Sequence, residues 1–273
     1  FDKLYFKANC LMSMLIPPLH SYYHWSKLQR QQYSGNFQPN YVYRNFVYCF
    51  TIMKRRHLMR INEVEFYIPN YEETVSFYKN VLMFECLTET AETANFRVGN
   101  SIFTLHKEET HTYYYHVAFN IPPNLFYSAK KWVQEKIPLS TEDGEDEAHF
   151  SASKAKSFYF EDPAGNIVEY IARYETTPEA LEQEFNPHHV LEISEIGLPT
   201  TNVAKCVEEL QSLGIQRRSN TPIVNNTLIF LGEYEDGVYI IVAQIGRRWI
   251  FSSKPAIATP IIIHTNHGIV KNF

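Results

Sequence analysis

Polar and apolar residues alternate along Ile61–Ile68, which places Val64 and Phe66 on one face of a strand and Glu63 and Glu65 on the other. The apolar spacing then changes to that of a helix over residues 71–82. Short strands are predicted next at residues 84–87, 94–98 and 101–107, with a Gly99-Asn100 turn suited to a hairpin. The first unit is therefore a strand, a helix and three strands.

The same order of elements recurs twice along the chain. A second copy is predicted from a strand at 116–121, a helix at 125–136 and a hairpin of strands at 157–160 and 166–173. A third copy follows, with a strand at 193–198, a helix at 203–213 and strands at 228–231 and 238–242. Only one further apolar strand, at 257–264, remains for a fourth copy. Repeats of this kind predict an α+β fold of βαβββ modules that pair into a cup-shaped, mostly antiparallel sheet.

The order of the modules also predicts the domains. Modules 60–107 and 113–173 are joined by a short link, so we expect them to pair within a first domain at residues 59–176. A linker is expected at 177–189. Residues 190–273 would then hold the third module and a degenerate fourth, and the exposed edge of the third module allows a homodimer.

Residues 1–58 differ from the rest in charge and pattern. They carry eight Lys or Arg against one acid, a charge of +7, with 13 aromatic residues and no sustained period. A nucleic-acid-binding arm and a cleaved targeting peptide both fit part of this composition. A third hypothesis is a translated leader before a start at Met59, because Lys54-Arg55-Arg56 is encodable as a bacterial ribosome-binding sequence, AAA-AGG-AGG. We expect a non-native or disordered leader and exclude it from fold reasoning.

The remaining residues hold 17 basic and 29 acidic side chains, a net charge of −12 that argues against nucleic-acid binding. The four cysteines form no CxxC pair, and no apolar run approaches the roughly 20 residues that span a bilayer. A reducing, cytoplasmic location without membrane contact is expected. The chain also lacks a GxGxxG, Walker, GxSxG or HExxH motif.

Two segments resemble a known family. INEVEFYIPNYEETVSFYKNVLMFE (Ile61–Glu85) is similar to the first strand and helix of the vicinal oxygen chelate superfamily, and FEDPAGNIVEYIAR (Phe160–Arg173) to its closing hairpin. This superfamily includes glyoxalase I, bleomycin- and fosfomycin-resistance proteins and extradiol ring-cleaving dioxygenases. The resemblance covers about residues 60–264. The segments EIGLPTTNV and GRRWIFS further resemble bacterial members with a third module.

The resemblance implies a divalent metal ion, Fe(II), Mn(II), Ni(II) or Zn(II), held by Glu63, His116 and Glu169. The strand pattern agrees, because each of these residues lies on the face opposite its apolar neighbours. A buried carboxylate is costly without a proton or a cation. The alternatives are a solvated Glu63, a hydrogen-bonded core His116 and a cavity arginine that pairs with Glu169.

This chain departs from the family's pattern at two points. The first module ends in GNSIFTLHK, which offers Phe103 or Thr104 where glyoxalase I enzymes carry a carboxylate. Extradiol dioxygenases have histidine at the position of Glu63. The third module has Glu195 at its first-strand position but closes on an apolar run, so a second metal site is not expected.

Other residues are candidates for chemistry or recognition. His106 and Tyr67 are the candidate catalytic residues, since histidine titrates near neutrality. Arg247, Arg248, Trp249 and Tyr239 are candidates for substrate binding, with the two arginines as a carboxylate clamp. Alternatively, Trp249 anchors its loop while the arginines meet water. The acidic run TEDGEDE at 141–147 is expected to be a solvated insertion near the mouth of the cup, or else a lid.

Two functions follow from these expectations. One is a metal-dependent, glyoxalase-like or ring-cleaving dioxygenase-like enzyme of bacterial type that acts on a small molecule with adjacent oxygens. The other is a protein that sequesters a small molecule or antibiotic without chemistry, as the bleomycin-resistance relatives do.

Overall fold

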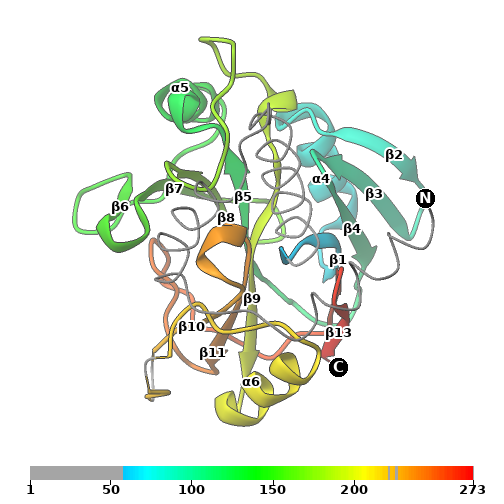
Figure 1. Ribbon diagram of the computed structural model, residues 1–273. Helices are drawn as coiled ribbons and strands as arrows, with labels where there is room; N and C mark the ends of the chain where they lie inside the picture. The colour runs from blue at the N-terminus through cyan, green and yellow to red at the C-terminus, as the bar shows by residue number, and fades with distance from the viewer. Residues whose placement is uncertain (1–57, 221, 225–226, 273) are drawn as a thin grey trace, which may run out of the picture. The chain divides into compact units, whose positions relative to one another are not determined.

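The computed structural model of the protein describes residues 58–220, 222–224 and 227–272. These residues form a six-stranded sheet and a seven-stranded sheet with helices packed against them (Figure 1). The expectations for residues 1–57 lie outside the described residues.

The six-stranded sheet, the first sheet below, contains the first module and the end of the chain. Its order is β13-β12-β1-β4-β3-β2. The strands are β1 (Ile61–Ile68), β2 (Glu85–Glu89), β3 (Thr93–Val98), β4 (Ser101–Lys107), β12 (Ile261–Thr265) and β13 (Gly268–Asn272). The helix after β1 is α4 (Tyr71–Ser76), which continues as a π-helix over Phe77–Val81.

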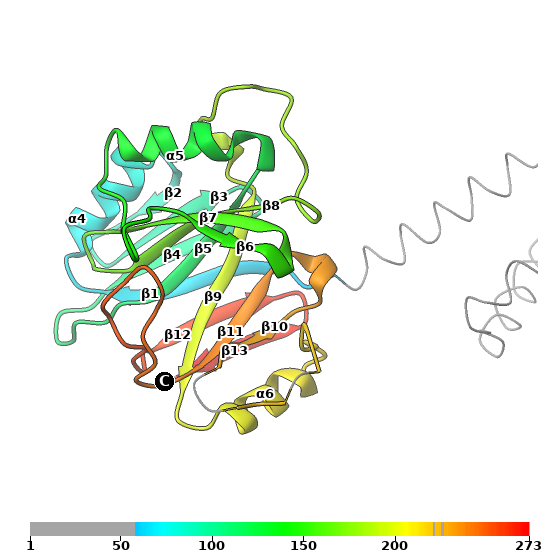
Figure 2. The ribbon, with the colours of Figure 1, turned by 90° about the vertical axis from the view of Figure 1, so that its left-hand side faces the viewer.

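The seven-stranded sheet, the second sheet below, is built from the second and third modules. Its order is β10-β11-β9-β5-β8-β7-β6. The strands are β5 (His116–Ile121), β6 (Ala148–Phe150), β7 (Ala155–Glu161), β8 (Ile167–Arg173), β9 (Glu192–Thr200), β10 (Ile229–Leu231) and β11 (Tyr239–Gln244). Its helices, α5 (Phe126–Gln134) and α6 (Val203–Ser212), lie at the top and the bottom of Figure 2.

The α+β fold of curved sheets built from βαβββ modules is confirmed, but the modules pair differently from our expectation. β5 pairs antiparallel with β9, so the second module joins the third. β1 pairs antiparallel with β12, so the first module joins the C-terminal strands, which are two rather than one. The first strand of each module offers a similar backbone edge for pairing. Two modules that are neighbours in sequence therefore need not pair with each other. The third module is therefore already paired, and a homodimer through it stays a prediction.

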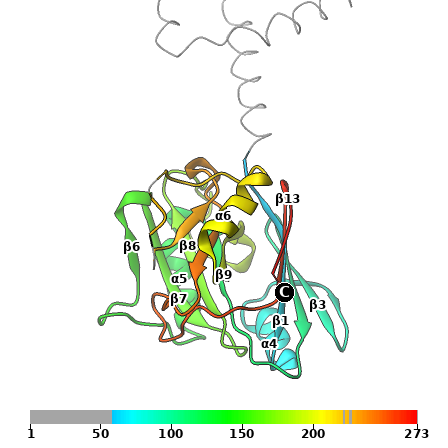
Figure 3. The same ribbon diagram turned by 90° about the horizontal axis from the view of Figure 1, so that it is seen from below.

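One apolar core is shared by the two sheets. Phe66 and Phe103 of the first sheet meet edge to face at 5.1 Å between ring centroids, and Phe103 meets Phe119 of the second sheet at 6.1 Å. In Figure 3 the labelled strands of the first sheet lie to one side of the molecule and those of the second sheet to the other. Because side chains alternate along a strand, the residues between the core positions of each sheet point away from this core. On the second sheet, this opposite face carries the candidate site.

None of the described helices is both long enough and apolar enough to cross a membrane. Of the described cysteines, Cys86 and Cys206 are both free thiols. The other two cysteines, Cys10 and Cys49, lie outside the described residues.

Candidate metal centre

Three strands of the second sheet bring an imidazole and two carboxylates together. Ala118 in β5 pairs with Glu169 in β8 on one side and with Glu195 in β9 on the other. His116 lies two residues before Ala118 and so on the same face of the sheet. One ligand atom from each of His116, Glu169 and Glu195 lies within 4.8 Å of the other two.

The three side chains are close and almost wholly buried. His116 Nε2 lies 3.5 Å from Glu169 Oε2 and 3.9 Å from Glu195 Oε2. Relative exposures are 5% for His116, 2% for Glu169 and 6% for Glu195. Charged groups are seldom buried this deeply unless a partner compensates them, so the cluster needs a cation or a proton.

The imidazole of His116 is oriented by the backbone. Its Nδ1 lies 3.3 Å from the carbonyl oxygen of Ile167, which can only accept a hydrogen bond. Nδ1 therefore carries the proton, and Nε2 faces the two carboxylates with its lone pair when the ring is neutral. Burial by itself lowers the pKa of His116, but contact with Glu195 and the negative charges of both glutamates raise it overall.

A buried arginine holds Glu195. Arg173 Nη2 donates a hydrogen bond to Glu195 Oε1, and its Nε and Nη2 also donate to Ser194 Oγ at 3.3 and 3.2 Å. The β5–β9 register shifts beside these residues, and a bulge of this kind re-aims neighbouring side chains. Burial raises the pKa of Glu195, but the charge of Arg173 and the contact with His116 lower it overall.

Glu169 has the opposite electrostatic environment. Among the described residues, its buried Oε1 accepts no well-aligned hydrogen bond, although the hydroxyls of Tyr159 and Ser157 lie near enough to lower its pKa slightly. Burial, and then the negative charge of Glu195, raise the pKa of Glu169 to about 7. Two carboxylates with opposite pKa shifts therefore lie beside the same imidazole: the pKa of Glu195 is lowered and that of Glu169 is raised.

The Asp-Pro-x-Gly-Asn turn fixes the strand that carries Glu169. Asp162, which is buried, accepts hydrogen bonds from the backbone N–H and the side-chain amide of Asn166 and from the hydroxyl of Tyr78, each at 2.8 Å. Asn166 Oδ1 in turn accepts from the backbone N–H of Tyr115, the residue before His116. The turn therefore sets the starts of β5 and β8 relative to each other.

The donor set fits a divalent ion. Two ligands that each lie about 2.1 Å from one ion are at most about 4.2 Å apart. The two distances from His116 Nε2, 3.5 and 3.9 Å, meet this limit. The unpartnered Oε1 of Glu169 supplies a further lone pair, so the residues present suit a metal such as Fe(II), Mn(II), Ni(II) or Zn(II).

Aromatic rings cover the cluster. The ring of Trp249 lies over His116 with centroids 5.0 Å apart, and Phe251 stacks on Tyr159 at 4.7 Å. Gly197 makes room for the indole, because a Cβ on Gly197 would lie 2.8 Å from Trp249 Cη2. These rings keep water away from the carboxylates.

Of the three predicted ligands, the structure brings together two. Glu63 lies in the first sheet, where its Oε1 accepts a 2.7 Å hydrogen bond from Thr104 Oγ1, and Glu195 stands beside His116 instead. The placement of Glu63 with His116 was wrong because it assumed that the first two modules share a sheet. Thr104, and not Phe103, is the residue on the face of Glu63.

The candidate catalytic pair also belongs to the first sheet. Tyr67 and His106 stack at 4.8 Å, and His106 Nε2 lies 2.7 Å from Glu65 Oε2. Glu65 Oε1 lies 2.8 Å from His264 Nε2, so one carboxylate bridges two imidazoles. This network is on a different sheet from His116 and Glu169.

The candidate substrate-binding residues are divided. Tyr239 faces the cup, where the guanidinium of Arg173 lies 4.9 Å from its ring centroid. Arg248 pairs with Glu142, and Arg247 donates to the carbonyl oxygen of Arg248 at 2.9 Å. Trp249 lies against the cluster itself, as its ring contact with His116 shows.

Sequence reasoning missed Glu195 as a candidate ligand and Arg173 as its hydrogen-bond partner. Glu195 occupies the same first-strand position as His116, which was the available signal. It was set aside because the third module closes on an apolar run without a carboxylate. In the structure, Ile241 of this run pairs with Gly197. Arg173 ends the closing hairpin, and nothing local in the sequence distinguishes it from a surface arginine.

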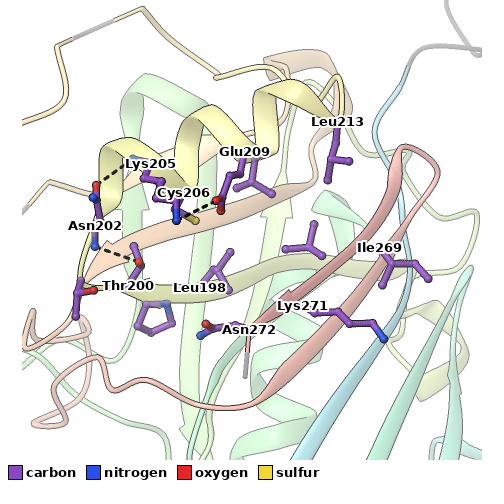
Figure 4. A pocket seen from close by; sticks show the side chains of 14 residues that line it. Leu198, Thr200, Asn202, Lys205, Cys206, Glu209, Leu213, Ile269, Lys271 and Asn272 are labelled. Atoms are coloured by element: carbon purple, nitrogen blue, oxygen red, sulfur yellow. Dashed lines mark hydrogen bonds and ion pairs between the residues drawn. The ribbon is translucent and has the colours of Figure 1, made fainter.

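A separate groove of about 340 Å³ lies between α6 and β13 (Figure 4). Lys205, Cys206 and Glu209 line it from the helix, and Ile269 and Lys271 line it from the strand. None of its lining residues belongs to the His116 cluster.

Comparisons with known proteins agree with the fold. Residues 193–247, which include Glu195, match the family model described as toxoflavin-degrading enzyme. The metallothiol transferase FosB of Shouchella clausii (strain KSM-K16) is 31% identical, over 43% of this chain and 88% of the relative. The FosB protein of Staphylococcus saprophyticus subsp. saprophyticus is 28% identical, over 41% of this chain and 76% of the relative.

A solved structure extends the likeness to most of the chain. The proposed dioxygenase from Bacillus subtilis subsp. subtilis str. 168 aligns with a TM-score of 0.50 at 16% identity, covering 78% of this chain and 70% of that one. At this identity the likeness concerns the fold alone. The FosB relative that is 31% identical to this chain shows that the chain belongs to the vicinal oxygen chelate superfamily, and the fold agrees.

Proposed function

We propose that the cup of the second sheet holds one divalent ion on His116, Glu169 and Glu195. In this proposal the protein is an enzyme that acts on a small molecule with two neighbouring oxygens. The observation that carries the proposal is the unpartnered, buried Oε1 of Glu169 beside an imidazole whose Nε2 faces two carboxylates. The FosB relatives are metallothiol transferases by name, which supports metal-dependent chemistry in this family.

The chain supplies three protein ligands, which leaves positions on the ion for two oxygens of a substrate. A bound ion would act there as a Lewis acid. The chain's own residues would orient the substrate and move a proton. In the metal-free cup, burial raises the pKa of Glu169 to about 7, so this side chain would release its proton when it binds the ion. Burial raises the pKa of Tyr159 well above its ordinary value, so its hydroxyl remains a donor.

The aromatic surroundings favour a flat ring in the substrate. Trp249, Phe251, Tyr159 and Tyr239 belong to one apolar cluster on the face of the cup. This supports ring cleavage more than glyoxalase-like isomerisation. In ring cleavage, one dioxygen is consumed per substrate and both of its atoms enter the product, whereas isomerisation consumes no oxidant.

A binding protein is the second candidate. Rings that stack on a planar ligand hold it without any reaction, and the closed cup would keep it from water. This function needs no metal, so saturable binding by metal-free protein would favour it.

Metal loading and oxygen uptake test the proposal together. The full chain would be loaded separately with Fe(II), Mn(II), Ni(II) and Zn(II), then offered catechols and thiol adducts of 2-oxoaldehydes. The proposal expects turnover of one of these classes that is lost in His116→Ala and Glu169→Gln. Protein that takes up none of the four ions would refute the metal-dependent function and leave the binding function.

A further inference from the structure

The segment between β11 and β12 folds back over the cup as a small hairpin, residues 246–256. Gly246 N–H donates to the carbonyl oxygen of Ala256 at 2.8 Å, and Ala256 N–H donates to that of Arg247 at 2.7 Å. Trp249 N–H donates to the carbonyl oxygen of Lys254 at 3.1 Å. The hairpin therefore moves as a unit and carries Trp249 and Phe251 with it.

The two rings fill the space in front of the cluster. Trp249 lies against both His116 and Gly197, and its Cζ2 would be 2.9 Å from a Cβ at Gly197. Phe251 stacks on Tyr159 with ring planes 13° apart. Both rings are buried, and with them in place the three candidate ligands are buried as well. A ligand cannot reach His116 until these rings move.

Polar contacts from several segments hold the hairpin at the rim, one of them from the hydroxyl of Tyr114 to the carbonyl oxygen of Pro255 at 2.6 Å. Glu142, from the acidic run 141–147, accepts hydrogen bonds from Arg248 and from the backbone N–H of Phe251. On the other side, Lys254 Nζ donates to Glu161 Oε2 and to the carbonyl oxygen of Gly165, both at 2.7 Å. Glu142 therefore binds the hairpin at two points, the guanidinium of Arg248 and the backbone N–H of Phe251. Among the described residues, the other acidic side chain hydrogen-bonded to the hairpin, Glu161, binds it at one point.

The backbone of the hairpin is under strain where Glu142 holds it. Phe251 has φ of +53°, in the left-handed region that a bulky residue rarely adopts. At the other end, Gly246 has φ of +88° with open space where its Cβ would be. A segment that has a strained residue bound by a carboxylate at one point and a conformationally permissive glycine at its start is suited to a change of conformation.

We infer that the hairpin 246–256 is a plug latched by Glu142, which opens to admit the ion and the ligand. The indole of Trp249 lies against His116 and Gly197, which are neighbours on β5 and β9, and a planar ring of a ligand takes the place of the indole when the plug opens. The identity of the ligand rests on the proposed function, whereas the opening of the plug does not require a metal.

Quenching of Trp249 fluorescence tests the latch. The chain has three tryptophans, Trp25, Trp132 and Trp249, so Trp25→Phe with Trp132→Phe leaves Trp249 as the sole emitter. In this full-length, metal-free background, Glu142→Ala is compared with Glu145→Ala, an acidic neighbour in the same run. Arg248→Ala breaks the latch from the hairpin's side. Circular dichroism confirms that each variant is folded.

The acrylamide quenching constant of Trp249 is expected to rise at least threefold in Glu142→Ala and in Arg248→Ala, and to stay unchanged in Glu145→Ala. Equal quenching in all variants would overturn the plug. A second measurement, the rate at which EDTA extracts bound Mn(II), is expected to rise at least threefold in the same two variants. If no ion binds, the proposed function fails and quenching alone still decides the plug. If an ion binds but neither quantity changes, the plug fails and the proposed function stands.

Discussion

Arg173 donates a hydrogen bond to one oxygen of Glu195 and leaves the other oxygen facing His116. Both side chains of this ion pair are buried. The arginine compensates one of the two carboxylates in the cup and not the other. For this reason the pKa of Glu195 is lowered, whereas burial and its charged neighbour raise the pKa of Glu169 to about 7.

Removal of the arginine charge should destabilise the metal-free protein. In Arg173→Met the cup would hold two carboxylates without a cation, and loss of one partner of a buried pair costs about 3–5 kcal/mol. Arg173→Lys keeps the charge and should lose less. Urea unfolding at pH 7.5 measures both variants. An Arg173→Met protein as stable as wild type would show that Arg173 does not compensate Glu195.

The stability of metal-free protein should fall as pH rises from about 4.5 to about 7. In this window Glu169, whose pKa is raised by burial, keeps a proton in the folded state that the unfolded chain has released. The neighbouring groups that set this behaviour are Glu195, His116 and Tyr159. Glu169→Gln should flatten the dependence. Parallel pH profiles for the two proteins would contradict the raised pKa.

Metal affinity should depend on pH in the opposite sense, because an ion and a proton compete for Glu169 and His116. With one proton displaced, affinity should fall about tenfold per pH unit below about 7. Titration of Mn(II) at pH 6, 7 and 8 measures this effect.

Gly197→Ala should cost about 1–3 kcal/mol of stability through overpacking. The new Cβ would lie 2.8 Å from Trp249 Cη2 and 3.3 Å from His116 Cβ. Trp249→Leu removes the first of these contacts, so Gly197→Ala should cost at least about 1 kcal/mol less in that background. Unfolding by urea of the four proteins of the cycle gives the coupling. If the destabilisation of the double variant equals the sum of the two single variants, the contact between the new Cβ and Trp249 is not the cause of the cost.

Glu65 should contribute to the free energy of unfolding near neutral pH and lose this contribution in acid. Burial raises its pKa, but hydrogen bonds from His264 and His106 lower it overall, so the stabilisation is lost as pH falls through the lowered value. The difference in unfolding free energy between wild type and Glu65→Gln should therefore shrink below about pH 4.5. A difference that is constant from pH 7 to pH 3 would argue against this network.

Local pattern predicted much of the fold. The alternation along β1 and the spacing of α6 correspond to elements that the structure contains, and His116 and Glu169 lie where the strand pattern put them. Strand pairing between modules was not predictable, because it depends on contacts far apart in sequence and all first strands offer similar edges. This error placed Glu63 in the cluster in place of Glu195. The roles of Trp249 and Glu142 likewise arise only when distant segments fold together.

The comparison of Glu195→Gln with Glu63→Gln tests the central claim most directly, since both residues occupy the first-strand position of a module. The measurement is metal content per chain by inductively coupled plasma mass spectrometry, after loading and removal of free ion. We predict about one ion per chain in wild type and in Glu63→Gln, and almost none in Glu195→Gln. An ion retained in Glu195→Gln and lost in Glu63→Gln, or a wild type that binds none, would contradict the account.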